Sequence, residues 1–281
     1  MERDMGRMAI WATVLSLALC GCACAETAPQ QIVTQSWHGL AGLYVIPTAR
    51  TIGEHNLAIG YNESKHVEIF SSARFMDRQI RAPFTFGLFK RLEISAVYQS
   101  NQYDVSHQPI LDNSSLTSFG AKLVLLEETK RMPAVAIAVR DIGDQDKDVA
   151  PLKNLHNGRK FFLLASKRIV DNKQTGRFVD AHLGLGQDDL SSLSPMFGAE
   201  IAVAPTASLI AEGMWDSPYV NFRGTYINPA RIGTSDHQGR FIFCTGVRWY
   251  PDVVPGLVID TGIVGDGSME FSFGASYVFR R

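Results

Sequence analysis

Apolar and polar residues alternate with a period of two along most of this chain. The stretch RLEISAVYQ at residues 91–99 places leucine, isoleucine, alanine and tyrosine on one face, and glutamate, serine and glutamine on the other. The same alternation recurs in HNLAIGYN, PAVAIAVRD, RFVDAHLGLG, MFGAEIAVA, ASLIAEGMWD and MEFSFGASYVF. A period of two is typical of β-strands with different surroundings on their two faces. Turn-rich segments separate these runs, so the pattern predicts about a dozen strands and no helix longer than two turns.

One face of these strands is apolar, whereas the other is small or polar. This combination predicts an all-β fold, an antiparallel transmembrane β-barrel of about 12 strands. Because lipid offers no hydrogen bonds, a sheet that crosses a membrane must close on itself. A soluble all-β sandwich or propeller would also alternate and stays open as the alternative. The amphipathic last run ends on the aromatic Phe279, which favours the barrel, although Arg280 and Arg281 follow it.

The chain begins with MERDMGRMAIWATVLSLALCGCACAET, which has the three parts of an export signal. The apolar core, Met8 to Leu19, is shorter than the roughly 20 residues that a membrane-spanning helix needs. The sequence therefore predicts a signal peptide over residues 1–25 and a single outer-membrane barrel domain over residues 26–281. Lipid attachment at Cys22, preceded by LCG, is the alternative to cleavage after Ala25.

The composition and the motifs of the chain limit the classes of function that it can have. The 281 residues are 46% hydrophobic and 20% charged, with a formal net charge of −1, as in a folded protein without a general attraction to nucleic acid. Only one cysteine, Cys244, follows the signal region, so an internal disulfide is excluded and a buried thiol is expected. The DQDKD motif starts like a calcium loop but lacks its glycine and its final glutamate. No cofactor, metal or catalytic motif is recognisable.

Several charged or polar residues fall on the expected inner face of the barrel. These lumen candidates are Glu93, Arg140, Asp180, His182, Glu200, Glu212 and Arg248. We expect the lumen carboxylates to pair with lumen arginines. A pair of carboxylates facing across a cleft, as in glycosidases, stays open as the enzymatic alternative.

Four segments resemble a known family in their order along the chain. They are GLAGLYVIPTART at residues 39–51, then SFGAKLVLLEETKRMPAVAIAVRDIG, KFFLLASKRI followed by DAHLGLG, and MFGAEIAV. They are similar to the YjbH-like outer-membrane proteins of Gram-negative bacteria, which are associated with exopolysaccharide or capsule production. The resemblance runs from about residue 39 to 204 and more loosely to the end. Larger members carry a second barrel region, so this chain resembles a short, single-barrel member.

The first of these segments, GLAGLYVIPTART, contains Gly39, Gly42, Pro47 and Arg50. We expect it to be the leading segment and first strand of the barrel, with the glycines allowing close backbone approach and the proline ending the strand. The alternative is that it lies inside the lumen as a plug.

The resemblance implies a non-enzymatic protein of the Gram-negative outer membrane, associated with polysaccharide production or export. Its polar lumen would accommodate or gate a glycan, or dock a periplasmic export component. Outer-membrane lipid, polysaccharide and such periplasmic components are the expected partners, and nucleic acid is not. An outer-membrane enzyme acting on glycan or lipid, and a structural barrel without a conduit, are the alternatives.

Overall fold

The architecture was examined in a computed structural model of the chain. The structure describes residues 33–70, 73–105, 114–143, 159–172, 175–188, 193–216, 240–265 and 269–280. The expected signal peptide and Cys22 lie outside these residues, as does the DQDKD motif. Within them, no helix is long and apolar enough to cross a membrane.

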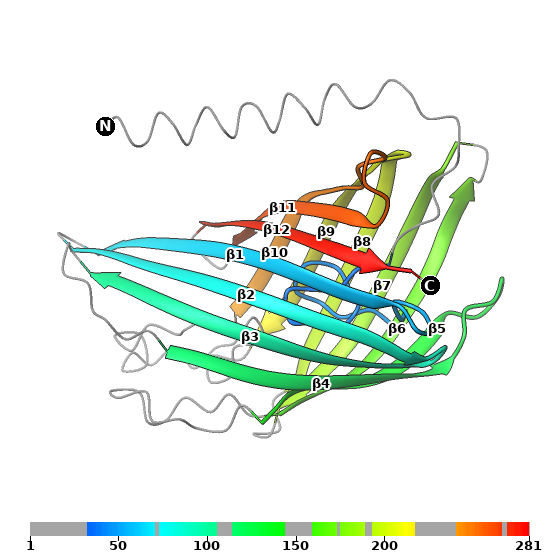
Figure 1. The fold of residues 1–281 in the computed structure, drawn as a ribbon, viewed down its shortest axis with the longest axis horizontal. Helices are drawn as coiled ribbons and strands as arrows, with labels where there is room; N and C mark the ends of the chain where they lie inside the picture. Colours follow the sequence, from blue (N-terminus) through cyan, green and yellow to red (C-terminus); the bar gives the residue numbers. More distant parts are fainter. Residues whose placement is uncertain are drawn as a thin grey trace.

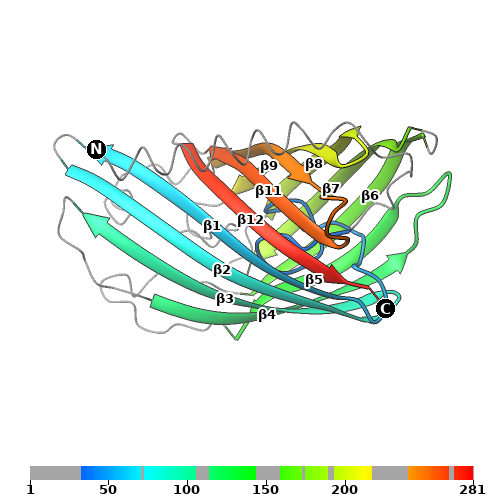
Figure 2. The ribbon, with the colours of Figure 1, turned by 45° about the horizontal axis from the view of Figure 1, so that its top comes forward.

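Twelve strands make up the described part of the fold. They are β1 (Leu57–Phe70), β2 (Ala73–Phe89), β3 (Leu92–Val105), β4 (Ser114–Leu126), β5 (Ala134–Ile142), β6 (Lys160–Asn172), β7 (Arg177–Asp188), β8 (Leu193–Ala204), β9 (Ala207–Asp216), β10 (Arg240–Trp249), β11 (Leu257–Gly265) and β12 (Met269–Phe279). Each strand pairs antiparallel with its neighbours in the chain, and β1 pairs with β12 to close the barrel (Figures 1 and 2). The predicted fold class is confirmed, since this is an antiparallel β-barrel without a free sheet edge.

Burial alternates along each strand as the sequence predicts. In β8 the exposed and buried positions follow each other almost strictly, with Phe197 and Ile201 outside and Glu200 inside. Large apolar side chains dominate the exposed set, including Leu183, Leu193 and Phe271, each about two-thirds exposed. An apolar exterior of this kind is suited to lipid, where side chains alternate between the membrane and the lumen.

The inner face of the barrel has two different walls. β5 to β11 carry buried charged side chains, such as Glu212 and Arg248, together with buried apolar ones that we call the apolar wall: Ala134, Ala136, Ala138, Phe162, Leu164, Met196, Ile210, Met214, Ile242, Cys244 and Val264. On β1 to β3 and β12 the buried side chains are mostly hydroxyls, amides and charges. The expected buried thiol, Cys244, is part of the apolar wall. The hydrophobic core of this protein therefore lies inside the barrel and needs something apolar to pack against it.

That partner is the segment before β1. Residues 33–56, which we call the plug, lie inside the ring of strands as a blue coil in Figures 1 and 2. Leu40, Leu43, Val45 and Ile46 in the plug are at most 1% exposed and belong to the same apolar cluster as the apolar wall. The expectation that GLAGLYVIPTART forms the first strand is thus wrong. The first strand starts at Leu57, and the alternative position in the lumen is the observed one.

The reason lies in the distribution of apolar residues. From Leu40 to Ile46 the chain is apolar at every position except Gly42, so it has no polar face to turn toward water. Such a run is stable only if it is surrounded by other apolar groups. The plug folds back on itself through two isolated bridges, Gln35 with Ala41 and Gly42 with Pro47.

The two ends of the barrel differ. β1 begins and β12 ends at the same end, where Leu57 pairs with Phe279. No connection at this end, which we call the turn end, is longer than 7 residues, whereas β5 and β6 are joined by 17 residues and β9 and β10 by 23 at the other end. The plug joins β1 there, so the chain passes into the first strand from the turn end (Figure 1).

A lipid-facing position should tolerate charge poorly. We expect Leu183→Arg, in the middle of β7, to destabilise the barrel in lipid by about 2–4 kcal/mol, because the guanidinium would be placed near the centre of the bilayer. Gln187→Arg, on the same outer face near the end of β7, is the matched control, with an expected cost of about 0–1 kcal/mol. Urea unfolding in lipid vesicles, followed by the faster gel mobility of unboiled protein, measures both. Equal costs would contradict a lipid-facing exterior.

Candidate functional site

The candidate site is the plugged lumen. In the plug, Gly39 has a φ of +94°, and a Cβ there would lie 2.8 Å from Val97 Cγ2. A Cβ on Gly42 would lie 2.4 Å from the carbonyl oxygen of Ile46, across a turn closed by a bond from Leu43 N to that same oxygen. Both glycines therefore allow the backbone of the plug to fold tightly on itself. The sequence predicts this close backbone approach in a strand, whereas it occurs in the plug.

Two glutamates of the barrel wall hold the plug backbone. Glu93 on β3 accepts hydrogen bonds from Ala41 N at 2.7 Å and from Ile52 N at 3.1 Å. Lys122 on β4 lies 2.9 Å from Glu93 and donates to the carbonyl oxygen of Ala41 at 2.8 Å. All of these groups are buried, so the ion pair is fully enclosed and its remaining hydrogen-bonding capacity is used by the plug.

Glu212 on β9 does the same for the tip of the plug. Its two carboxylate oxygens accept hydrogen bonds from Val45 N at 2.9 Å and Ile46 N at 3.1 Å. These two N–H groups lie at a turn and have no strand beside them. One carboxyl group supplies both acceptors, so a single side chain satisfies two neighbouring N–H groups.

Arg248 on β10 approaches the plug from another side. It forms an ion pair with Asp260 at 2.8 Å and a second with Glu200 at 3.5 Å. Its guanidinium also donates, at 3.4 Å, to the carbonyl oxygens of Gly42 and Leu43. This side chain links two lumen carboxylates to the backbone of the plug. Among the lumen glutamates, the expected pairing with an arginine is seen for Glu200, whereas Glu93 pairs with Lys122 and Glu212 binds backbone N–H groups of the plug.

The side chain of Tyr44 in the plug contacts the barrel wall. Its hydroxyl lies 2.7 Å from the carbonyl oxygen of Val247 and 2.9 Å from that of Thr261. Burial raises the pKa of Tyr44 well above its ordinary value, so the hydroxyl keeps its proton as a donor. Gly246 makes room for this ring, since a Cβ there would lie 2.7 Å from the tyrosine oxygen.

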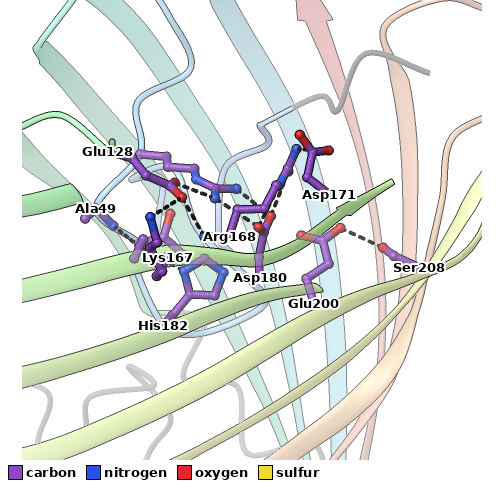
Figure 3. Close-up of polar contacts among 12 residues, drawn as sticks. Ala49, Glu128, Lys167, Arg168, Asp171, Asp180, His182, Glu200 and Ser208 are labelled. Carbon is purple, nitrogen blue, oxygen red and sulfur yellow. Dashed lines mark hydrogen bonds and ion pairs between the residues drawn. The ribbon is translucent and has the colours of Figure 1, made fainter. Parts of the chain in front are cut away.

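A second polar group surrounds Arg50, where the plug approaches the turn end. Arg50 lies 2.5 Å from one oxygen of Asp180 and 2.9 Å from the other, and 3.0 Å from Glu128. Arg168 binds both oxygens of Asp180, at 2.9 and 3.0 Å. We call these four residues the Arg50 cluster. Figure 3 shows Glu128 and Arg168 gathered near Asp180, with His182 farther along the same strand.

Arg50 keeps its charge at any ordinary pH. Burial alone would lower the pKa of Arg50, but the hydrogen bonds and negative charges of Asp180 and Glu128 raise it above its usual value. Next to the cluster, Ser166 Oγ accepts a hydrogen bond from Ala49 N at 2.8 Å and lies 2.8 Å from His182 Nδ1. Through these contacts β6 and β7 hold Ala49 and Arg50 of the plug.

The remaining lumen candidates divide between the plug and other groups. Glu200 accepts hydrogen bonds from Ser208 and from Tyr250, both at 2.6 Å, in addition to its contact with Arg248. Arg140 lies in a separate group, 3.1 Å from Asp141, which also binds Lys160 at 2.8 Å. The structure therefore brings Glu93, Asp180, His182, Glu200, Glu212 and Arg248 into the surroundings of the plug, and it places Arg140 apart from them.

The sequence reasoning missed several residues of the site. Lys122 and Asp260 occupy inward positions in alternating strands, so the same period of two could have found them. Glu128 and Arg168 gave no such signal, because a turn and the end of a strand carry no alternation. Among the described residues, no group of three or more His, Cys, Asp or Glu side chains is arranged to hold a metal ion.

The sequence and the fold can now be compared with known proteins. The family model described as "Exopolysaccharide biosynthesis protein YbjH" matches residues 34–196, more than half of the chain. The chain belongs to the YjbH family. The matched part includes nearly all of the plug and the strands that carry Glu93, Lys122 and the Arg50 cluster. No curated protein sequence matches the chain.

Solved outer-membrane barrels are similar to this YjbH-family chain in structure. The KdgM porin is 8% identical, with a TM-score of 0.50, over 79% of this chain and 99% of the porin. An outer membrane channel from Pseudomonas putida F1 is 11% identical, with a TM-score of 0.48 over 81% and 96%. The Acinetobacter baumannii outer membrane protein Omp33 is 9% identical, with a TM-score of 0.45 over 80% and 99%. The predicted location in the Gram-negative outer membrane agrees with this fold.

The fit between Leu43 and the wall can be tested directly. A Cβ on Gly198 would lie 2.4 Å from Leu43 Cδ1, so Gly198→Ala should destabilise the seated plug by about 1–3 kcal/mol through overpacking. Leu43→Ala removes the clash but leaves a cavity of its own, so the double variant should lose less stability than the two single changes added together. Hydrogen exchange of the amides in residues 33–56 measures the two single variants and the double variant. Equal protection in the wild type and Gly198→Ala would contradict the observed packing.

The role of Glu212 leads to a second expectation. In Glu212→Gln an amide group replaces one acceptor, so Val45 N or Ile46 N loses its partner, at a cost of about 1–3 kcal/mol. Exchange should accelerate at these two amides. Glu127→Gln is the matched control, because Glu127 is a half-exposed carboxylate that binds Lys90 and Arg91 outside the lumen. Acceleration at the plug in both variants would show that the effect is not local.

Proposed function

We propose that this protein is a non-enzymatic outer-membrane barrel of exopolysaccharide production whose lumen is a conduit or holding site for a glycan strand, kept closed by the plug. The observation that carries the proposal is that a separate folded segment lies inside the lumen (Figure 1) and is held there by side chains of the wall. The barrel closes through β1 and β12 without using the plug. Removal of the plug would therefore leave the cylinder intact and its lumen empty.

The orientation of the barrel supports this role. Short turns of outer-membrane barrels face the periplasm, and so we place the turn end there. The plug then joins the barrel on the periplasmic side, where a polymer made inside the cell would arrive. A periplasmic export component would meet the plug and the Arg50 cluster at this end. The family description, exopolysaccharide biosynthesis, agrees with such a position.

The lumen carboxylates favour transport over catalysis. A glycosidase needs two carboxylates that face each other across a cleft open to the substrate. Glu93 and Glu212 are occupied by backbone N–H groups of the plug, and Glu200 is bound to Ser208, Tyr250 and Arg248. Each of them has a structural task in the closed lumen, so we favour a protein without an activity of its own. The conductance of a variant without the plug distinguishes this proposal from the alternative of a barrel without any conduit.

Deletion of residues 39–51 is the decisive experiment. We expect the shortened protein to form a heat-modifiable barrel, and its single-channel conductance in planar bilayers to exceed that of the wild type at least tenfold. The wild type should conduct little, because the plug fills the lumen. Assembly without any gain in conductance would favour the structural barrel, whereas failure to assemble would show that the plug is needed for folding. Gly198→Ala should give an intermediate conductance and needs no deletion.

A further inference from the structure

A pocket of about 620 Å³ opens beside the Arg50 cluster at the turn end. Four basic side chains line it, Arg50, Lys130, Lys167 and Arg168, against two carboxylates, Glu128 and Asp171. The volume lies within the range of small-molecule sites. The excess of basic groups suits an anionic ligand, and arginine is the residue best shaped to bind a carboxylate through two parallel hydrogen bonds.

Arg50 is the plug residue in this lining. A ligand in the pocket would therefore touch the plug and the barrel wall together. Arg168 and Lys167 come from β6, and Lys130 comes from the turn between β4 and β5. Lys167 donates to the carbonyl oxygens of Thr129 and of Lys130, the latter at 3.1 Å, which holds this turn beside the pocket. The rim is thus built by the protein before any ligand arrives.

Arg50 can leave its partners without stranding a buried charge. Asp180 would keep Arg168, which binds both of its oxygens. Glu128 would keep the backbone N–H of Arg168 at 2.7 Å and Lys167 at 3.6 Å. Breaking a buried ion pair is strongly unfavourable when one partner stays behind alone, and here neither carboxylate does.

We propose that this pocket binds a carboxylate-bearing oligosaccharide and that the ligand, by taking Arg50 from Asp180 and Glu128, releases the end of the plug that precedes β1. This inference rests on the proposed function, because it names the ligand class and the regulation of the same lumen. Its consequence is that an acidic glycan arriving from the turn end opens its own path. A neutral glycan lacks the group that competes for Arg50.

Binding is tested by calorimetric titration of the purified full-length protein with a hexasaccharide of mannuronate, and with maltohexaose as the neutral comparison. We expect only the mannuronate ligand to bind. Lys130→Glu should weaken its binding at least tenfold, because Lys130 is exposed on the rim and its side chain is not part of the Arg50 cluster. Lys90→Glu, at another turn of the same end and outside the pocket, is the matched control and should bind like the wild type.

Release is tested with Ile52→Cys in a Cys244→Ser background, because Ile52 is 5% exposed and lies in the end of the plug that the ligand releases, outside the apolar cluster of the wall. The mannuronate ligand should accelerate labelling of this cysteine by a maleimide at least tenfold, and Cys244→Ser alone corrects for labelling of other cysteines. In Arg50→Gln labelling should be fast without ligand and gain nothing from it. Unchanged labelling despite binding would overturn the release step.

The outcomes separate this inference from the proposed function. Absence of mannuronate binding, equal binding of maltohexaose, or wild-type binding by Lys130→Glu would overturn the pocket as a carboxylate site. If the deletion of residues 39–51 conducts in that case, the conduit stands and only the inference falls. If ligand binding and Ile52→Cys labelling behave as expected but the deletion does not conduct, the pocket stands and the conduit falls.

Discussion

Every backbone N–H and C=O group that leaves water needs a hydrogen-bonding partner, and this requirement governs both the outside and the inside of the molecule. In the barrel the ladders between neighbouring strands satisfy it, and closure of β1 on β12 leaves no free edge in lipid. The plug has no such ladder beyond two isolated bridges. Some of its N–H groups bond to carbonyls of the plug itself, as Leu43 N does to Ile46 O, and others depend on side chains of the wall. Glu93 and Glu212 each accept two of these.

This dependence explains why charged residues line a lumen that is also rich in apolar side chains. Carboxylates sit where the plug exposes N–H groups, and basic groups sit where it exposes carbonyls, as Lys122 does at Ala41 and Arg248 at Gly42. The apolar wall meets the apolar residues between these points. A lumen that serves only as an aqueous passage would have no use for such a wall, because apolar side chains facing water contribute nothing to stability.

The sequence predicted the parts of this arrangement that depend on a local period. The alternation predicts that Glu93, Glu200 and Glu212 lie on the inner face, because a side chain in a strand points to one of only two faces. It could not predict that Glu93 stands beside Lys122, because the register between strands is a long-range property. The apolar residues of the plug resemble strand residues in type, which is why the sequence predicts a strand there. A local feature of the sequence distinguishes the plug from the strands. Residues 40–46 are almost continuously apolar, whereas apolar and polar residues alternate in the strands of this barrel.

The energetics of the plug limit how a conduit could open. Five of its side chains, Leu40, Leu43, Tyr44, Val45 and Ile46, are at most 1% exposed, and burying an apolar side chain of this size contributes roughly 1.5–3 kcal/mol. Complete withdrawal into water would thus cost on the order of 10 kcal/mol, far more than the roughly 5.5 kcal/mol that separates a 99% closed from a 99% open population. Thermal motion alone would leave such a barrel closed.

A partial movement is much less costly. Hydrogen bonds from the plug to Glu93, Lys122 and the Arg50 cluster can be replaced by water or by a ligand, so their net contribution is about 0.5–3 kcal/mol each. The contacts with the apolar wall on β5 to β11 have no such replacement. A displacement that keeps the apolar contacts and opens the side of β1 to β4 is therefore the cheaper route. It also requires differential binding by a ligand or partner, because only a group that binds the open state better can shift the equilibrium. The polar contacts of the plug, and not its apolar core, are consequently where regulation can act.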